Sequence, residues 1–206
     1  QLEQMLQADV DEISEWAKRK RLSVEPSKCF ITLFTPDMAR ESKTHPRVFL
    51  PDATGAPVLI PLSKKPRVLG VTWDTHFNFS AHADAVVKAC KGRLQTLRLL
   101  AGTSWGCNKE TLLRAYKVYF EPLINYAAPI WAPNASVSAV QRVQRAQNAA
   151  LRIVTGCHSA TRWEYLNQET KVLPVSHKLD LLSSQYLASS LRPSHPSHSA
   201  VVSDAG

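Results

Sequence analysis

Six prolines between residues 36 and 66 mark a region that cannot fold like the rest of the chain. They are Pro36, Pro46, Pro51, Pro57, Pro61 and Pro66. Because proline fixes one backbone torsion and lacks an amide hydrogen, they exclude a long helix there and limit strand pairing to sheet edges and strand starts. From Ser80 onward, apolar residues recur instead at the three- and four-residue spacing of helices. The sequence therefore predicts an α+β chain, in which a small N-terminal helix-plus-hairpin unit precedes a mainly α-helical bundle.

The residues before the prolines carry one helix pattern and one strand pattern. Residues 2–17 place apolar side chains on one helical face. The run Lys18–Arg21 follows, where cations complement the C-terminus of a helix, although a phosphate site is the alternative. Leu22 and Val24 then predict a hairpin with residues 30–34.

Two more strand patterns lie within and just after the proline-rich stretch. Residues 48–50 and 58–60 flank the turn residues 52–55, which predicts a second, peripheral hairpin. The stretch RVLGV, residues 67–71, predicts a strand that re-enters the sheet. Gly70 within it is typical of a bulge or of a close approach by another backbone.

The remaining residues predict a succession of helices. The first pattern begins near Ser80 and is ended by Gly102. The second runs from Asn108, which can cap its helix, to Trp131 with a break at Pro122, and the others cover 137–154, 161–169 and 176–191. Gly156 is expected to stop the third of them. The final low-complexity stretch RPSHPSHSAVVSDAG is expected to be mobile.

Positive charge is concentrated in the second part of the chain. The net charge is +8, and residues 1–63 hold eight Lys and Arg against nine Asp and Glu, whereas residues 64–206 hold seventeen against eight. A one-sided surplus of cations is the footprint expected for contacts with phosphates, although it also serves as ordinary solubilising charge. The four cysteines form no CxxC pair, and no set of His and Cys has the spacing of a zinc site, so we predict no metal site.

Several classes of protein are disfavoured by what the sequence lacks. No run approaches the roughly 18 uncharged apolar residues of a membrane span, and the first residues do not have the layout of a secretory signal. We therefore expect an intracellular protein, nuclear or cytoplasmic, without a membrane partner. No GxSxG, Walker or GxGxxG motif is present. Four tryptophans offer stacking surfaces for bases, although burial is the more common fate of such side chains. They are Trp73, Trp105, Trp131 and Trp163.

Four stretches follow one another in a recognisable order: LQADVDEISEWAKRKRLSVEPSKCFITLF, RVLGVTWDTHFNFSAHADAVVKACKGRLQTLRLLAG, LLRAYKVYFEPLINYAAPIWAP and VQRVQRAQNAALRIVTGC. Their order resembles the end of a non-LTR (LINE-type) retrotransposon reverse transcriptase, after its catalytic palm motif and through the thumb. The resemblance covers about residues 1–190. It implies the end of the palm with its primer-grip strand at 1–78, thumb helices at 79–156, connecting helices at 157–191 and a flexible tail at 192–206.

The resemblance also implies roles for individual residues. The palm element beside the incoming nucleotide matches Trp16, Leu22, Pro26 and Lys28, which makes Lys28 the candidate for the nucleotide site. The strand that grips the primer matches Arg67, Leu69, Gly70 and Val71. The cations expected to hold phosphates on the helices are Lys88, Lys91, Arg93, Arg98, Arg114, Lys117, Arg142, Arg145 and Arg152.

The expected partners are an RNA template, a DNA primer duplex and the missing upstream fingers and palm of the same polyprotein. In the family, carboxylates bind two Mg²⁺ ions for synthesis. The aromatic-Ala-Asp-Asp turn that supplies them is absent, and Asp84 lies in a helical pattern without a second adjacent Asp. We therefore expect a fragment with no catalytic residue and no cofactor of its own, inactive in synthesis alone. The alternative is an inactive basic helical module that binds nucleic acid or protein.

Overall fold

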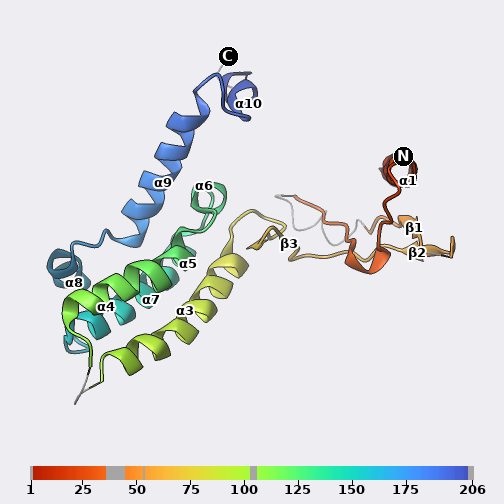
Figure 1. The fold of residues 1–206 in the computed structure, drawn as a ribbon. Coiled ribbons are helices and arrows are strands. Elements are labelled where there is room, and N and C mark those ends of the chain that lie inside the picture. The colour runs from red at the N-terminus through yellow and green to blue at the C-terminus, as the bar shows by residue number, and fades with distance from the viewer. Residues whose placement is uncertain (1, 36–44, 53, 103–105, 204–206) are drawn as a thin grey trace. The chain divides into compact units, whose positions relative to one another are not determined.

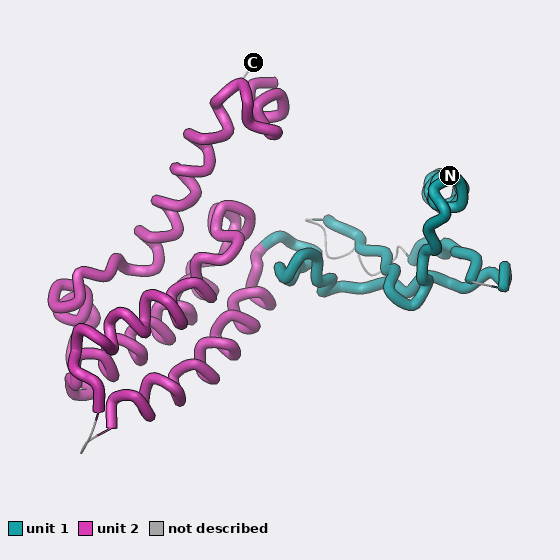
Figure 2. Tube along the Cα trace, in the orientation of Figure 1, with its two compact units in different colours: residues 1–77 teal, residues 78–206 magenta. Residues whose placement is uncertain are grey.

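The computed structural model describes residues 2–35, 45–52, 54–102 and 106–203. It divides into two compact units, residues 1–77 and 78–206 (Figure 2). The first contains short strands and one long helix, and the second is helical (Figure 1). The predicted α+β class is confirmed.

Unit 1 is built on helix α1 and the hairpin β1–β2. Its elements are α1 (Leu2–Arg19), the 3-10 turn η1 (Pro26–Lys28), β1 (Phe49–Pro51), β2 (Pro57–Leu59), β3 (Arg67–Val68) and β4 (Val71–Thr72). Val48, Leu50 and Ile60 form a small core that α1 covers with Leu6 and Val10. Gln7 joins the helix to the hairpin, because its amide donates to the Phe49 carbonyl (2.9 Å) and accepts from the Phe49 amide (2.8 Å). The second predicted hairpin is confirmed as this antiparallel pair.

The predicted pairing of Leu22 and Val24 with residues 30–34 is wrong. Pro26 begins η1 instead, and Ile31 forms a parallel bridge with Leu62, its amide donating to the Pro61 carbonyl (3.0 Å). The extended segment 30–35 thus takes a distant partner. A turn that contains proline early favours a 3-10 start over a tight hairpin loop, because the fixed torsion suits the first helical position.

The RVLGV stretch forms a complete hairpin of its own. Val68 pairs with Val71, so Leu69 and Gly70 alone make the turn. Both have positive φ, 47° and 83°, as the two central residues of a type I′ turn require. Gly70 therefore serves the turn and marks no bulge, and the predicted single strand is corrected to two short ones.

Unit 2 is a helical bundle arranged around α7. Its elements are α3 (Ser80–Leu100), α4 (Lys109–Ala115), the π-helix η2 (Tyr116–Phe120), α5 (Glu121–Asn125), α6 (Ala128–Trp131), α7 (Val137–Thr155), α8 (Trp163–Thr170), α9 (Val175–Ser190) and α10 (His198–Ser203). Helices α3 and α7 pack along each other. They run in the same direction, since the Ser136 amide before α7 donates to the Asn78 carbonyl before α3 (3.0 Å).

Local signals in the sequence explain where these helices begin and end. The Asn108 side chain caps α4 by accepting from the Thr111 amide (2.9 Å), and Ser136 caps α7 through Ala139 (3.2 Å). Gly156 ends α7 in the left-handed conformation at φ 68°. The break expected at Pro122 takes the form of η2 directly before it, because proline has no amide hydrogen for the preceding turn and its ring crowds that turn.

Helices α8 and α9 lie at the positions predicted for them, and α10 lies within the stretch predicted as a mobile tail.

Trp131 is fully buried, and its indole nitrogen donates to the Tyr126 carbonyl (3.0 Å). Within the described ranges, no helix has both the length and the apolar character needed to cross a bilayer.

Candidate nucleic-acid interface

Helix α3 carries a cationic stripe, defined here as Lys88, Lys91 and Arg98. Spacings of three and seven residues place them on one side of the helix, and all three are exposed. The opposite side is committed to the core through Val86, Cys90, Leu94 and Leu97. None of the three cations forms an ion pair with a described residue, and Arg98 donates only to the amide oxygen of Gln95 (3.4 Å).

Arg93 lies on α3 outside this stripe and has an aromatic partner. Its guanidinium carbon is 3.7 Å from the centre of the Tyr119 ring, so the group stacks on η2. A cation held over a ring in this way is stabilised by the ring quadrupole. Arg93 therefore ties α3 to η2.

The three arginines predicted on α7 differ in their surroundings. Arg142 pairs with Asp84 (2.8 Å) and donates to the carbonyl (3.2 Å) and hydroxyl (3.1 Å) of Ser80. Arg152 donates to the Thr161 carbonyl (2.8 Å). Arg145 is exposed and has no such partner among the described residues. Two of the three thus hold the bundle together, and Asp84 is a structural ion-pair partner.

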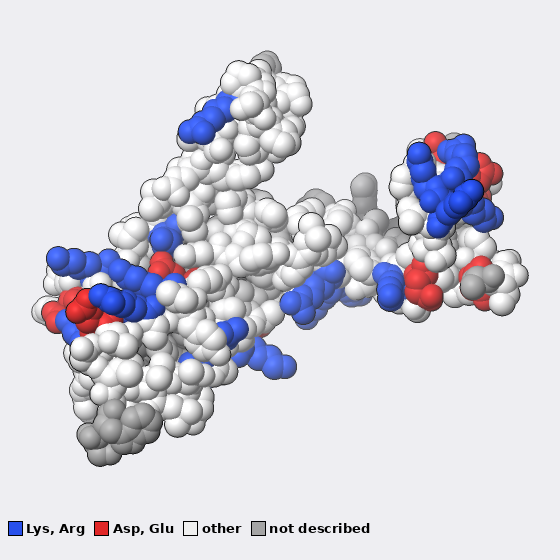
Figure 3. All heavy atoms as spheres, in the orientation of Figure 1, with Lys and Arg blue, Asp and Glu red and all other residues white. Residues whose placement is uncertain are grey.

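The cations around α4 and η2 also divide into paired and unpaired ones. Arg114 pairs with Glu110 (2.7 Å) one turn earlier on an exposed surface, and Lys109 pairs with Glu169 of α8. Figure 3 shows acidic side chains beside basic ones at this end of unit 2. Lys117 is exposed on η2 without an ion pair to a described residue. The predicted cations that remain available are therefore the α3 stripe, Lys117 and Arg145.

The β3–β4 hairpin carries the four residues that the resemblance assigns to the primer. Arg67 is exposed on β3, Val71 is buried on β4, and the turn residue Leu69 is 87% exposed. A large apolar side chain at positive φ, pointing into solvent, is unfavourable on both counts. Such a residue is a candidate for contact with a ligand or another chain.

We expect Leu69→Asn to stabilise unit 1 by about 1 kcal/mol, because asparagine tolerates the left-handed conformation and Asn-Gly is the preferred pair of a type I′ turn. Urea unfolding monitored by circular dichroism measures the change. Leu69→Val is the matched control and is expected to be destabilising, since β-branched residues disfavour positive φ. Equal stability of the two variants would contradict the turn assignment.

Lys28 closes η1 and is exposed. Its neighbours Glu25 and Ser27 hydrogen-bond with each other, the hydroxyl donating to the carboxylate (3.0 Å). The Lys28 ammonium has no ion pair with a described residue, and Lys28 is not part of the small core formed by Val48, Leu50 and Ile60. Lys28 is thus available to a phosphate. Its exposure fits equally well with a solvated surface lysine.

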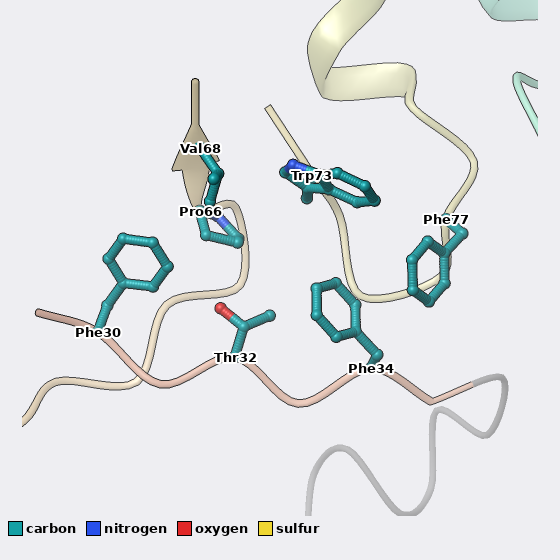
Figure 4. A pocket seen from close by; sticks show the side chains of 7 residues that line it. All are labelled: Phe30, Thr32, Phe34, Pro66, Val68, Trp73 and Phe77. Carbon is teal, nitrogen blue, oxygen red and sulfur yellow. The ribbon is translucent and has the colours of Figure 1, made fainter. Parts of the chain in front are cut away.

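An aromatic pocket in unit 1 was not foreseen as a site. It has a volume of about 270 Å³ and is lined by Phe30, Thr32, Phe34, Pro66, Val68, Trp73 and Phe77 (Figure 4). The signal in the sequence is the alternation of Phe30, Thr32 and Phe34, which places three side chains on one face of an extended segment. Among the tryptophans considered for stacking, Trp73 lines this pocket, Trp131 is buried, Trp163 is 40% exposed, and Trp105 lies outside the described residues.

Acidic, His and Cys side chains do not gather into a group of three that could hold a metal ion anywhere in the described ranges.

Asp74 is buried in the turn before α3, where its carboxylate accepts from the His76 amide (3.3 Å). Burial raises the pKa of the Cys90 thiol to about 12, an effect that the nearby charge of Arg93 partly opposes.

Comparison with known proteins agrees with the order of motifs in the sequence. The chain is 27% identical over 193 residues, 89% of its length, to the probable RNA-directed DNA polymerase from transposon X-element of Drosophila melanogaster. It is 27% identical over 181 residues, 88% of its length, to the corresponding protein from transposon BS of the same organism. The chain is similar to transposon RNA-directed DNA polymerases. The resemblance to a retrotransposon reverse transcriptase is thereby confirmed.

These matches cover most of this chain but a small part of the relatives. The chain spans about a fifth of the length of each curated relative, 20% and 19%. No protein-family model matches the sequence, and no solved structure matches it.

Proposed function

We propose that the chain is a nucleic-acid-holding part of a transposon RNA-directed DNA polymerase, and that it binds the primer–template duplex through phosphates. The observation that carries the proposal is the α3 stripe. Its three cations share one side of a helix, are exposed, and have no carboxylate partner among the described residues. Phosphate contacts of this kind give affinity without reading sequence.

The surroundings of the stripe favour this role over a merely solubilising one. The other predicted cations of α3 and α7 have specific partners, Arg93 on Tyr119, Arg142 on Asp84 and Arg152 on the Thr161 carbonyl. They keep α3 and α7 in fixed positions and leave the stripe open. A rigid row of charges loses less side-chain and backbone freedom on binding a regular polyanion than a mobile one does.

Unit 1 supplies the proposed contacts to the primer end and the nucleotide. In this proposal Leu69, at the turn between β3 and β4, touches the primer strand and Arg67 neutralises its phosphate; the exposure of both side chains supports these roles. Lys28 would lie beside the leaving pyrophosphate of the nucleotide, where a cation stabilises developing charge. In a complete polymerase, carboxylates supplied by another part of the protein would hold the Mg²⁺ ions.

The remainder of that polymerase is the second proposed partner. Helix α1 buries Ala17 but leaves large apolar side chains exposed on one face, with exposures of 67% for Met5, 55% for Ile13 and 49% for Trp16. Several large apolar side chains exposed along one helix are typical of a surface that another segment covers. We propose that part of the longer polymerase covers this face of α1.

The salt dependence of binding tests the proposed function. Fluorescence anisotropy with a labelled RNA–DNA hybrid should give a log affinity that falls linearly with log salt, with a slope of about −0.9 for each phosphate contact. Replacing Lys88, Lys91 and Arg98 together with Ser should make that slope shallower by about 2 to 3, because three contacts are lost.

A variant with the same change in net charge serves as the control. Lys18, Arg19 and Lys20 lie at the C-terminal end of α1, where they complement the helix dipole. Their replacement with Ser should leave the slope close to that of the unmodified chain. A slope that responds only to the α1 variant, or an affinity that does not change with salt, would refute the role of the α3 stripe.

A further inference from the structure

The end of helix α1 carries a basic row, defined here as Lys18–Arg21, directly before an exposed serine. All four cations are exposed, and Ser23 follows them after the single apolar residue Leu22. None of the four forms an ion pair with a described residue, and Figure 3 shows basic side chains gathered over α1. Four of the five residues before Ser23 are therefore basic, whereas every other Ser or Thr of the sequence has at most two cations in its five preceding residues.

The helix dipole accounts for only part of the basic row. Lys18 and Arg19 lie in the last turn of α1, where cations complement the C-terminus of a helix. This effect falls off within the last turn, and Lys20 and Arg21 come after the helix has ended at Arg19. The turn that they form is held by the backbone, since the Arg21 amide donates to the Lys18 carbonyl (3.0 Å). The side chains of Lys20 and Arg21 are thus required neither by the helix nor by the turn.

Ser23 lies in a segment of unit 1 that has no regular structure. Residues 22–25 connect α1 to η1 and belong to no helix or strand. Within the described part of the chain, neither the backbone of Ser23 nor its hydroxyl has a hydrogen-bond partner. The next residue, Val24, packs against the small core of unit 1, so the segment is anchored while Ser23 stays exposed. The hydroxyl can therefore enter the active site of another enzyme without the loss of a helix or strand.

A second hydroxyl that follows two cations provides a contrast within the same chain. Thr96 comes after Lys91 and Arg93, but it is half-buried in the middle of α3. Arg93 is also engaged, because its guanidinium carbon lies 3.7 Å from the centre of the Tyr119 ring. Of these two hydroxyls, Ser23 is the one that is accessible together with its cations.

We propose that Ser23 is a phosphorylation site for a protein kinase that selects cations before its target serine. Charge patterns beside the target residue are a means by which kinases distinguish their substrates. In the transfer, the Ser23 hydroxyl oxygen attacks the γ-phosphorus of ATP and the bond from that phosphorus to the β-phosphate oxygen breaks. ADP leaves, and the hydroxyl proton passes to a carboxylate of the kinase.

The modification changes the charge at the end of α1. A phosphoserine adds a charge of about −1.5 to −2 at neutral pH, which offsets nearly half of the positive charge of the basic row. Nucleic-acid binding by the α3 stripe is not required for this modification, so the two proposals stand or fall separately.

Incubation of the complete 206-residue chain with ATP and protein kinase A tests the proposal, because this kinase selects Arg and Lys shortly before its target serine. Tandem mass spectrometry should place a phosphate on Ser23 and none on Thr96. Ser23→Ala should abolish this modification, and Ser23→Thr, which keeps a hydroxyl, should retain it. Lys20→Gln combined with Arg21→Gln should lower kcat/KM by about a hundredfold, since each charge-assisted hydrogen bond that is lost costs about tenfold.

Arg47→Gln combined with Lys65→Gln is the matched control, because these two exposed cations also belong to unit 1 and lie outside the basic row. This variant loses the same charge and should keep the kcat/KM of the unmodified chain. An unmodified Ser23, or a kcat/KM that does not change when Lys20 and Arg21 are replaced, would overturn the proposal. Modification of Thr96 at the same rate as Ser23 would also overturn it, since accessibility would then not select the target.

Discussion

Replacing Gln147 with Met is expected to lower the free energy of unfolding of unit 2 by about 3 kcal/mol. Gln147 is 2% exposed in the middle of α7, and its amide nitrogen donates to the Tyr116 hydroxyl and to the Leu173 carbonyl, both at 3.1 Å. Methionine fills a similar volume but offers no hydrogen bond. The Leu173 carbonyl then loses its partner, and each buried polar group left unsatisfied costs about 1 to 3 kcal/mol.

The effect should spread beyond the two direct partners. The amide of Gln144 donates to the Gln147 side-chain oxygen (2.8 Å), and the Gln144 oxygen accepts from the Val175 amide at the start of α9 (2.7 Å). This network joins α7 to η2 and to the segment that leads into α9. Removal of its central member therefore loosens three elements, and their coupling makes the loss larger than that of one hydrogen bond.

Urea unfolding followed by circular dichroism measures this prediction. Gln141→Met is the matched control, because Gln141 is exposed on the same helix and its replacement should change the stability by no more than about 0.5 kcal/mol. Tyr116→Phe should cost less in the Gln147→Met background than in the unmodified chain, since the hydroxyl has then already lost its donor. Equal losses for Gln141→Met and Gln147→Met would disprove the network.

The sequence predicted the helices of unit 2 well because their determinants are local. The apolar repeat between residues 137 and 154, the cap at Asn108 and the stop at Gly156 all lie within a few residues of the boundary that they set. Gln147 was overlooked because its type is polar, although it occupies the position between Val143 and Leu151 that belongs to the buried face. Its partners, Tyr116 and Leu173, are distant in sequence, so the polar network has no local signal.

Unit 1 was predicted less well because its pairings are not local. Residues 30–35 have strand-type side chains, but their partners are distant in sequence: Leu62 lies near the end of the proline-rich stretch and Thr75 lies beyond it. The RVLGV stretch gave the position of β3 and β4 correctly but not the reversal, because Leu-Gly is a rare pair for a type I′ turn.

In the candidate interface, too, the position of a cation on one helix could be predicted, whereas its partner on another helix could not. The exposure of Lys88, Lys91 and Arg98 follows from their spacing on α3 relative to its apolar face. By contrast, nothing in the local sequence says that Arg142 would pair with Asp84, 58 residues earlier in the chain. A list of cations on helices therefore overestimates the surface that is available to phosphates, since several of the cations are paired within the bundle. The aromatic pocket was missed for the reverse reason, because its lining comes from segments that meet only in the folded unit.

Raising the pH from 8 to 11 is expected to destabilise the chain by about 2 to 3 kcal/mol through Cys90 alone. This thiol is fully buried, and burial raises its pKa from 9.0 to about 12. Below pH 9 both the folded and the unfolded chain keep the proton. Between pH 9 and 12 the unfolded chain releases it while the folded chain retains it, so the unfolded state gains about 1.4 kcal/mol for each pH unit.

A difference between two variants isolates this contribution from the other groups that titrate in the same range. Burial also raises the pKa of the Tyr116 phenol, and this largest cause is common to the unmodified chain and Cys90→Ala; the variant loses only the smaller contribution from the charge of the Cys90 thiolate. The loss of stability between pH 8 and 11 should therefore be about 2 to 3 kcal/mol smaller in Cys90→Ala than in the unmodified chain. Cys107→Ala is the control, because Cys107 is exposed and its removal should leave the pH dependence unchanged. Parallel pH profiles for all three proteins would show that the Cys90 thiol is reached by solvent, and α3 would then not be packed against α7 as described.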